Sequence, residues 1–213
     1  QVMVRKAPQA FDTKAMIAAI ESGYSGDRKE EFKTKKSFSP STLVWGSGAC
    51  PRYWHLAFDG AVFAGDGDIN PKNIAAMANG TASHARLQKT IKNAGILHSE
   101  EIKIVQTDPP IFGYCDVILE WEGKLIPGEI KTMREEAFAY RKATGKAPGY
   151  HLAQILIYMR ELGADLGVMI YESKNSHELM AIPVEMTDEY NKWLDELYAW
   201  MREVRSTWSA KTL

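Results

Sequence analysis

Residues 113–132 read GYCDVILEWEGKLIPGEIKT, and this stretch decides the fold. Two extended runs rich in apolar and β-branched residues flank a Glu-Gly pair at positions 122 and 123. Such a pattern is typical of a β-hairpin with a short turn. We therefore expect strands over 112–121 and 124–132.

This hairpin places charged side chains close together. Residues two apart in a strand point to the same face, so Glu129 and Lys131 project together while Ile130 points to the opposite side. Asp116 belongs to the preceding strand and is expected beside Glu129 across the hairpin. Two carboxylates and one amine should then meet on one surface of the sheet.

The rest of the chain surrounds the hairpin with helices and further strands. Apolar residues at helical spacing alternate with turn signals throughout. The charged stretch 27–36 is predicted to be an exposed loop, and a break in the second helix near Gly48 is left open. Helices are expected over 9–22, 39–56, 71–93, 134–143, 149–161 and 187–206, and further strands over 101–105, 166–171 and 179–184.

This element order predicts an α/β fold with a central mixed sheet flanked by helices. At 213 residues, one domain spanning 1–213 is the simplest arrangement. Within it we expect a helical N-terminal part over 1–95, a sheet core over 96–186 and a C-terminal helix over 187–213.

Composition is that of an ordinary globular protein, with 45% hydrophobic and 25% charged residues. No apolar stretch approaches the ~20 residues that a membrane span needs, so no membrane association is expected. The N-terminal residues carry too many charges for a signal peptide. The two cysteines, Cys50 and Cys115, suggest reduced thiols in a cytoplasm. A net charge of −1 neither indicates nor excludes a nucleic-acid partner.

The carboxylates and the amine suit phosphodiester hydrolysis. Asp116 and Glu129 offer hard oxygen ligands to Mg²⁺ or Mn²⁺, and the backbone carbonyl of Ile130 could add another. Lys131 could orient the attacking water or stabilise the developing negative charge. Taken alone, such a short pattern is more often an ordinary alternation of charged residues on a solvated strand.

Other motifs in the chain strengthen the pattern. They are SPS at 39–41, CPRYW at 50–54, GTASH at 80–84, Asp116, EIKT at 129–132, Gln154 and Tyr158. This ordered set, over roughly residues 39 to 184, resembles the RecB-like exonuclease branch of the PD-(D/E)xK nucleases, which includes CRISPR-adaptation nucleases and phage enzymes. The resemblance implies a restriction-endonuclease-like core and a Mg²⁺ or Mn²⁺ cofactor.

The resemblance also implies roles for single residues. His84 would be a metal ligand together with Asp116, Glu129 and the carbonyl of Ile130. Considered alone, His84 is more often a satisfied histidine on a helix face.

Two more catalytic residues are implied on the helix that follows the sheet. Gln154 and Tyr158 lie four apart, so they share one helix face. Gln154 would hold the metal-site geometry or DNA, and Tyr158 would support the centre or contact the phosphate backbone, although a tyrosine at this spacing is more often part of the core.

Arg52, Tyr53 and Lys174 are candidate DNA contacts. Lys174 is expected at the end of a strand beside the strand of Glu129, but an exposed lysine there is equally ordinary. Tyr53 could stack on a base, although burial in the core is the commoner outcome. In some relatives a cysteine matching Cys50 joins three near the C-terminus in an iron–sulfur cluster. The last seven residues here contain no cysteine, so no iron–sulfur cluster is expected.

The sequence thus predicts a Mg²⁺- or Mn²⁺-dependent deoxyribonuclease, an exonuclease acting on DNA in recombination, replication or end processing. Two alternatives stay open: a structure-specific endonuclease, and a nucleic-acid-binding protein that kept the fold and lost turnover. The resemblance also leaves room for a homo-oligomer and for a recombination or replication partner protein. The expected setting is the cytoplasm of a bacterial or phage-infected cell.

Overall fold

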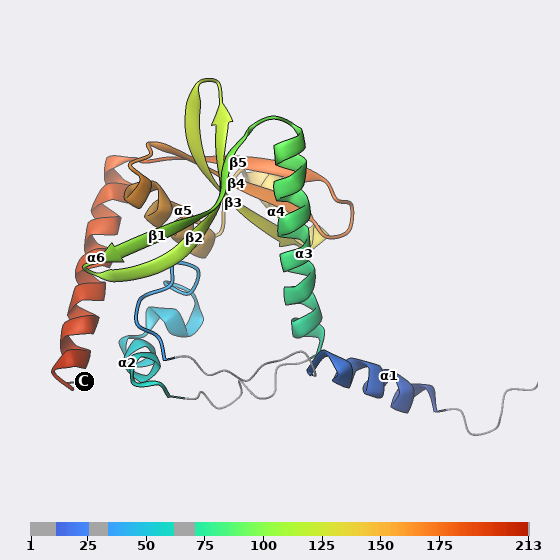
Figure 1. Ribbon diagram of the computed structural model, residues 1–213, viewed down its shortest axis with the longest axis horizontal. Coiled ribbons are helices and arrows are strands. Elements are labelled where there is room, and N and C mark those ends of the chain that lie inside the picture. The colour runs from blue at the N-terminus through green and yellow to red at the C-terminus, as the bar shows by residue number, and fades with distance from the viewer. Residues whose placement is uncertain (1–11, 26–33, 62–70, 213) are drawn as a thin grey trace, which may run out of the picture.

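The computed structural model describes residues 12–25, 34–61 and 71–212. A five-stranded sheet in the order β1-β2-β3-β4-β5 forms its centre (Figure 1). Only the β3–β4 pair is parallel, so the sheet is mixed, as predicted. The strands are β1 (Leu97–Thr107), β2 (Pro110–Trp121), β3 (Lys124–Met133), β4 (Leu166–Ser173) and β5 (Leu179–Glu185), and the α-helices are α1 (Thr13–Ser22), α2 (Pro51–Asp59), α3 (Pro71–Asn93), α4 (Glu135–Thr144), α5 (Gly149–Leu162) and α6 (Asp188–Ser209).

The central hairpin forms where the sequence predicted it. Trp121 pairs with Lys124, so Glu122 and Gly123 form a two-residue turn. Both turn residues have positive φ, +49° and +74°. This backbone is the one that matches the twist of paired strands, and glycine adopts it without strain.

The larger core lies on one face of the sheet. Residues 153–159 of α5 are all buried, and side chains of α6 and α2 belong to the same core. Gly167 in β4 permits the close approach of α5, because a Cβ atom at that position would lie 2.6 Å from the sulfur of Met159. The aromatic rings of Phe38, Trp54 and Phe58 contact one another at the outer end of this core.

Helix α3 covers the opposite face, as Figure 1 shows. Leu87 of α3 packs against Val117 and Ile130 in a second, smaller cluster. Ile130 therefore points toward α3, whereas α5 lies on the other side of β3. The strand that carries Glu129 is sandwiched between the two helices.

The helix predicted over 39–56 is wrong in its first half. Residues 40–45 form turns, a short 3₁₀ helix spans Gly46–Ala49, and α2 begins only at Pro51. The chain folds back on itself here: a Cβ atom on Gly48 would lie 1.8 Å from the carbonyl oxygen of Thr42. Proline at the first position of α2 suits a helix start, because its missing N–H would have no partner there.

The remaining predicted elements are present with shifted ends, although residues 9–11 of the first predicted helix and most of the predicted loop over 27–36 lie outside the described residues. In α1 the apolar residues Met16, Ile17 and Ile20 are exposed. Among the described residues, no helix is both long and apolar enough to cross a membrane.

Candidate active site

The site lies where β2 and β3 separate. Their pairing runs from Trp121 opposite Lys124 to Val117 opposite Gly128. At the next two positions, Asp116 and Glu129, the strands β2 and β3 no longer pair, and β3 continues beside β4.

A side chain replaces the lost backbone partner at this split. The backbone N–H of Ile130 donates a hydrogen bond to Oδ2 of Asp116 at 2.7 Å. A buried N–H needs a partner, and the carboxylate supplies it. The separation of the strands therefore fixes Asp116 beside the backbone of the Glu129–Lys131 segment.

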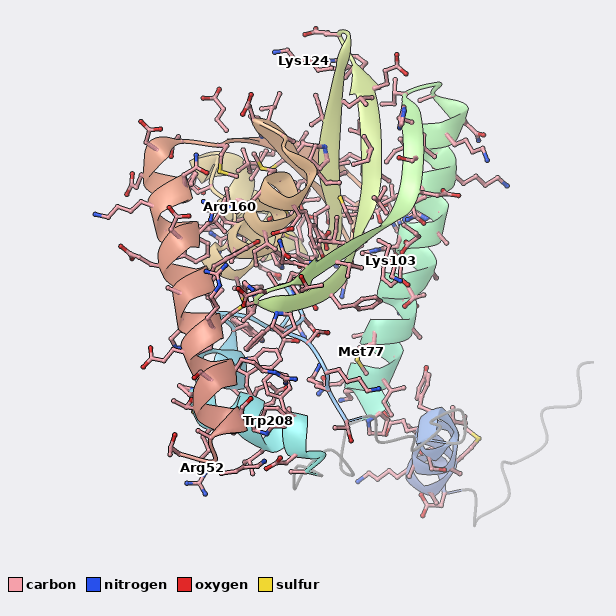
Figure 2. All side chains as sticks on the ribbon, turned by 60° about the vertical axis from the view of Figure 1, so that its left-hand side comes forward. Arg52, Met77, Lys103, Lys124, Arg160 and Trp208 are labelled. Carbon is pink, nitrogen blue, oxygen red and sulfur yellow. The ribbon has the colours of Figure 1, made fainter. Side chains whose placement is uncertain are left out.

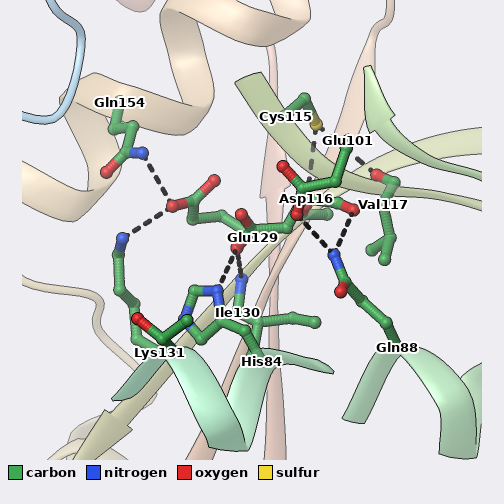
Figure 3. A network of polar contacts seen from close by, with 12 residues as sticks. His84, Gln88, Glu101, Cys115, Asp116, Val117, Glu129, Ile130, Lys131 and Gln154 are labelled. Carbon is green, nitrogen blue, oxygen red and sulfur yellow. Dashed lines mark hydrogen bonds and ion pairs between the residues drawn. The ribbon is translucent and has the colours of Figure 1, made fainter. Parts of the chain in front are cut away.

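Glu129 is held by two donors from different elements (Figure 3). Lys131 donates to Oε1 at 2.6 Å, and the amide nitrogen of Gln154 on α5 donates to the same oxygen at 2.7 Å. Glu129 and Lys131 do project to the same side, as their spacing predicts. The other oxygen, Oε2, is buried and has no hydrogen-bond partner among the described residues.

The buried position changes the acidity of Glu129. Only 1% of the residue is exposed. Burial raises its pKa from 4.5 to about 7, the nearby Asp116 carboxylate adds to this, and the charge of Lys131 opposes it. Removing a carboxylate from water disfavours its charged form. A cation near Oε2 would favour ionisation of Glu129 by offsetting this penalty.

His84 on α3 faces Asp116. Its Nδ1 lies 3.5 Å from Oδ2 of Asp116, and its side chain is about a quarter exposed. The interaction with Asp116 raises the pKa of His84 above its ordinary value, whereas burial lowers it. A metal ion would have to displace the proton that this pair attracts.

Gln88 also holds α3 to the site, and the sequence reasoning missed it. This residue is buried one helical turn after His84, and its amide nitrogen donates to the backbone carbonyl of Asp116 at 3.1 Å and to Glu101 at 2.8 Å. A spacing of four from His84 places both side chains on one helix face. That spacing was the available signal.

The donor chemistry fits a hard divalent cation, but the conformation fits only in part. Carboxylate oxygens are suitable ligands for Mg²⁺ and Mn²⁺, and Mn²⁺ also accepts an imidazole nitrogen as a ligand. The partnerless Oε2 of Glu129 is the oxygen that a cation would satisfy. Within residues 12–25, 34–61 and 71–212, however, no three His, Cys, Asp or Glu side chains already form a group that could hold a metal ion. Asp116 and Glu129 are instead turned partly to the Ile130 amide, Lys131 and Gln154.

Tyr158 supports the centre from within the core. Its hydroxyl accepts a hydrogen bond from Gln154 at 3.2 Å, and burial raises its pKa. Gly113 leaves room for this hydroxyl, because a Cβ atom there would lie 3.1 Å from it. Tyr158 thus contacts Gln154, which holds Glu129.

The predicted DNA contacts are scattered. Arg52 is exposed on α2, a helix that packs against α6, where His55 lies 3.1 Å from Thr207. Tyr53 is half-buried, with its ring edge-on to Trp54. Lys174 directly follows β4, which pairs with β3 as expected, and its side chain is exposed. Of the three, only Lys174 follows a strand that borders the strand of Glu129.

The chain matches no protein-family model and no curated protein. Among solved structures, the alkaline exonuclease LHK-Exo from Laribacter hongkongensis is similar, with a TM-score of 0.60 and 16% identity over 82% of this chain and 90% of that chain. LHK-Exo in complex with dAMP is similar to the same degree, with a TM-score of 0.60, 16% identity, and coverage of 82% and 89%. A phage-related exonuclease from Haemophilus somnus 129PT gives a TM-score of 0.48 and 12% identity over 90% of this chain and 94% of that chain.

The chain has the fold of an alkaline exonuclease. At 16% identity this similarity shows the fold alone, and the resemblance to PD-(D/E)xK nucleases stays a prediction. Assignment to the RecB-like branch stays a prediction.

Proposed function

We propose that this protein is a deoxyribonuclease that depends on Mg²⁺ or Mn²⁺ and removes nucleotides from DNA ends. The observation that carries the proposal is the buried Oε2 of Glu129 at the split between β2 and β3, which has no hydrogen-bond partner in the described part of the chain. His84, Asp116 and Lys131 gather around the same point from three elements (Figure 3). The fold supports this reading, because the similar structure LHK-Exo is an alkaline exonuclease.

The candidate ligands of the ion are Oε2 of Glu129, Asp116, His84 and the carbonyl of Ile130. When bound, a divalent ion would polarise the phosphate and lower the pKa of a water molecule. Gln154 and Lys131 fix Oε1 of Glu129, so Oε2 is the oxygen left for the ion.

Lys131 is the proposed electrostatic catalyst. Its side chain is about a quarter exposed while its ammonium group donates to Glu129, so the same group could also contact a substrate. There it would orient the attacking water and stabilise negative charge on the phosphate oxygens during bond cleavage. Gln154 keeps Glu129 in place through a hydrogen bond that does not depend on the substrate.

The decisive experiment is a time course with end-labelled single- and double-stranded DNA in Mn²⁺. We expect single nucleotides to be released by the parent, no release in EDTA, and loss of cleavage in the Lys131→Ala variant. Lys124→Ala is the matched control, because Lys124 is an exposed lysine on the same strand at the hairpin turn (Figure 2). Cleavage by Lys131→Ala at the parent rate would refute the assignment. Cutting of covalently closed circles would show an endonuclease instead.

A further inference from the structure

A cavity of about 410 Å³, lined mostly by polar side chains, lies near the candidate active site. It is bounded by α3, by the end of β3, and by the end of β4 with the turn that follows. Ser83 directly precedes His84 on α3, so the cavity lies beside the part of the candidate site that α3 supplies, whereas Thr132 lies on the α3 face of β3, opposite to the face of Lys131. The lining residues that matter for binding are Ser83, Arg86, Thr132, Glu172, Lys174 and His177.

Positive charge predominates in this cavity. The buried carboxylate of Glu172 is bridged by Nη2 of Arg86, at 2.7 Å from Oε1 and 2.6 Å from Oε2. His177 lies 3.4 Å from Oε1 of the same carboxylate. Arg86 alone neutralises Glu172, so Lys174 adds a net positive charge.

Several donors in the cavity remain available to a ligand. In the described part of the chain, the Arg86 side chain donates two hydrogen bonds, and both come from Nη2. The side chain is 49% exposed. Its Nε and Nη1 can therefore donate to an anion. The hydroxyls of Ser83 and Thr132 line the same space. Guanidinium, ammonium and hydroxyl donors together are the groups that bind phosphate.

Within the described residues, Lys174 makes its hydrogen bond through its backbone N–H and not through its side chain. Its N–H donates to the carbonyl of Met133 at 2.8 Å, which extends the β3–β4 pairing by one residue. The ammonium group can therefore be removed without disturbing the strand.

We propose that this cavity binds a backbone phosphate of the DNA strand, adjacent to the phosphate that is cut. The inference rests on the proposed nuclease function. The subsite holds the strand in register, so that the scissile phosphate reaches Lys131 and Glu129. Such a subsite contributes chiefly to substrate affinity, because it contacts no reacting atom.

The first test measures anion binding without any DNA. Inorganic phosphate added to the parent in EDTA is expected to raise its melting temperature by about 2 °C or more. Lys174→Glu should lose this increase, and Lys124→Glu, which makes the same charge change at the tip of the β2–β3 hairpin, should retain it (Figure 2). An equal increase in both variants, or none in the parent, would overturn the site.

The second test asks whether the ligand is a strand phosphate. Binding of a fluorescein-labelled single-stranded octamer is measured by anisotropy in EDTA, where the proposed reaction cannot run. One methylphosphonate linkage, which is neutral, is moved along the octamer. At one position the parent should lose about tenfold in affinity, the amount expected for one charged hydrogen bond. Lys174→Glu should bind more weakly by a similar factor and should not be sensitive to that linkage.

The two tests separate the possible failures. Phosphate binding that depends on Lys174, without any sensitive linkage, would mean a site for free phosphate and would refute the strand register. A parent protein that binds DNA with the expected linkage dependence but cuts none would refute the proposed nuclease and leave the subsite standing. If the parent cuts DNA and Lys174→Glu shows the same KM as Lys124→Glu, the subsite is refuted and the nuclease stands.

Discussion

Replacing Glu129 with glutamine tests whether the buried negative charge of Glu129 lowers the free energy of unfolding. In the metal-free protein, burial holds the pKa of Glu129 at about 7. The folded state therefore keeps its proton to a higher pH than the unfolded chain does. Consequently the free energy of unfolding of the parent should fall as pH rises from about 4.5 to about 7, and should change no further through this group above that range.

The size of the effect follows from the two pKa values. Between about pH 5 and about pH 8, the parent should lose roughly 2–3 kcal/mol relative to Glu129→Gln, which has no charge to bury. For a chain of this length, that corresponds to roughly 4–12 °C in melting temperature. The glutamine nitrogen would be buried where Oε2 has no partner. The resulting loss of stability does not depend on pH, so it cancels when the change between the two pH values is compared for parent and variant.

The assay is urea unfolding at both pH values in EDTA, with Glu120→Gln as control, because Glu120 is exposed on β2. The Glu129→Gln variant should also cut no DNA. If parent and Glu129→Gln showed parallel pH dependences, the carboxylate would not be a destabilising buried charge, and the electrostatic reasoning would fail.

Three further predictions follow from the same contacts. Mn²⁺ should raise the melting temperature more at about pH 8 than at about pH 6, because protons on Glu129 and His84, whose pKa values are both raised, compete with the ion; an equal or larger increase at the lower pH would contradict the proposed ligands. Gln154→Leu should move the acidic limb of the rate–pH profile to higher pH, because Glu129 loses a hydrogen-bond donor that favours its charged form and its pKa rises. An unchanged limb would show that Gln154 does not act on Glu129. Arg86→Leu should lower the free energy of unfolding by about 3–5 kcal/mol, because it removes the guanidinium that bridges the buried Glu172 carboxylate and leaves that carboxylate with His177, 3.4 Å away. Measured by urea unfolding, a loss below about 1 kcal/mol would mean that the carboxylate finds another partner or takes up a proton.

The local sequence pattern was sufficient to predict the β2–β3 hairpin at the centre of the sheet. Alternation predicts that Glu129 and Lys131 share a face, and a two-residue turn determines which residues of β2 lie opposite β3. Asp116 beside Glu129 follows from that register. Helices α3, α5 and α6 were equally visible, because each carries a sustained helical pattern.

Contacts between distant segments were not visible in the sequence. Arg86 and Glu172 are 86 positions apart, and nothing in either local pattern pairs them. The first half of the helix predicted over 39–56 was wrong for a different reason. Its apolar residues have helical spacing, but the close contact of Gly48 with Thr42 requires a turn. Tertiary packing decided the structure there, and not local propensity.

The hydrogen bond from the Ile130 amide to Asp116 has a practical consequence for capturing DNA complexes. Alanine at position 116 would leave that amide buried without an acceptor, whereas asparagine keeps an oxygen that can accept its hydrogen bond. If Asp116 is a ligand of the proposed ion, Asp116→Asn should weaken cation binding while it keeps the contact between β2 and β3. A bait protein for crystallising or isolating uncut substrate should carry this single exchange.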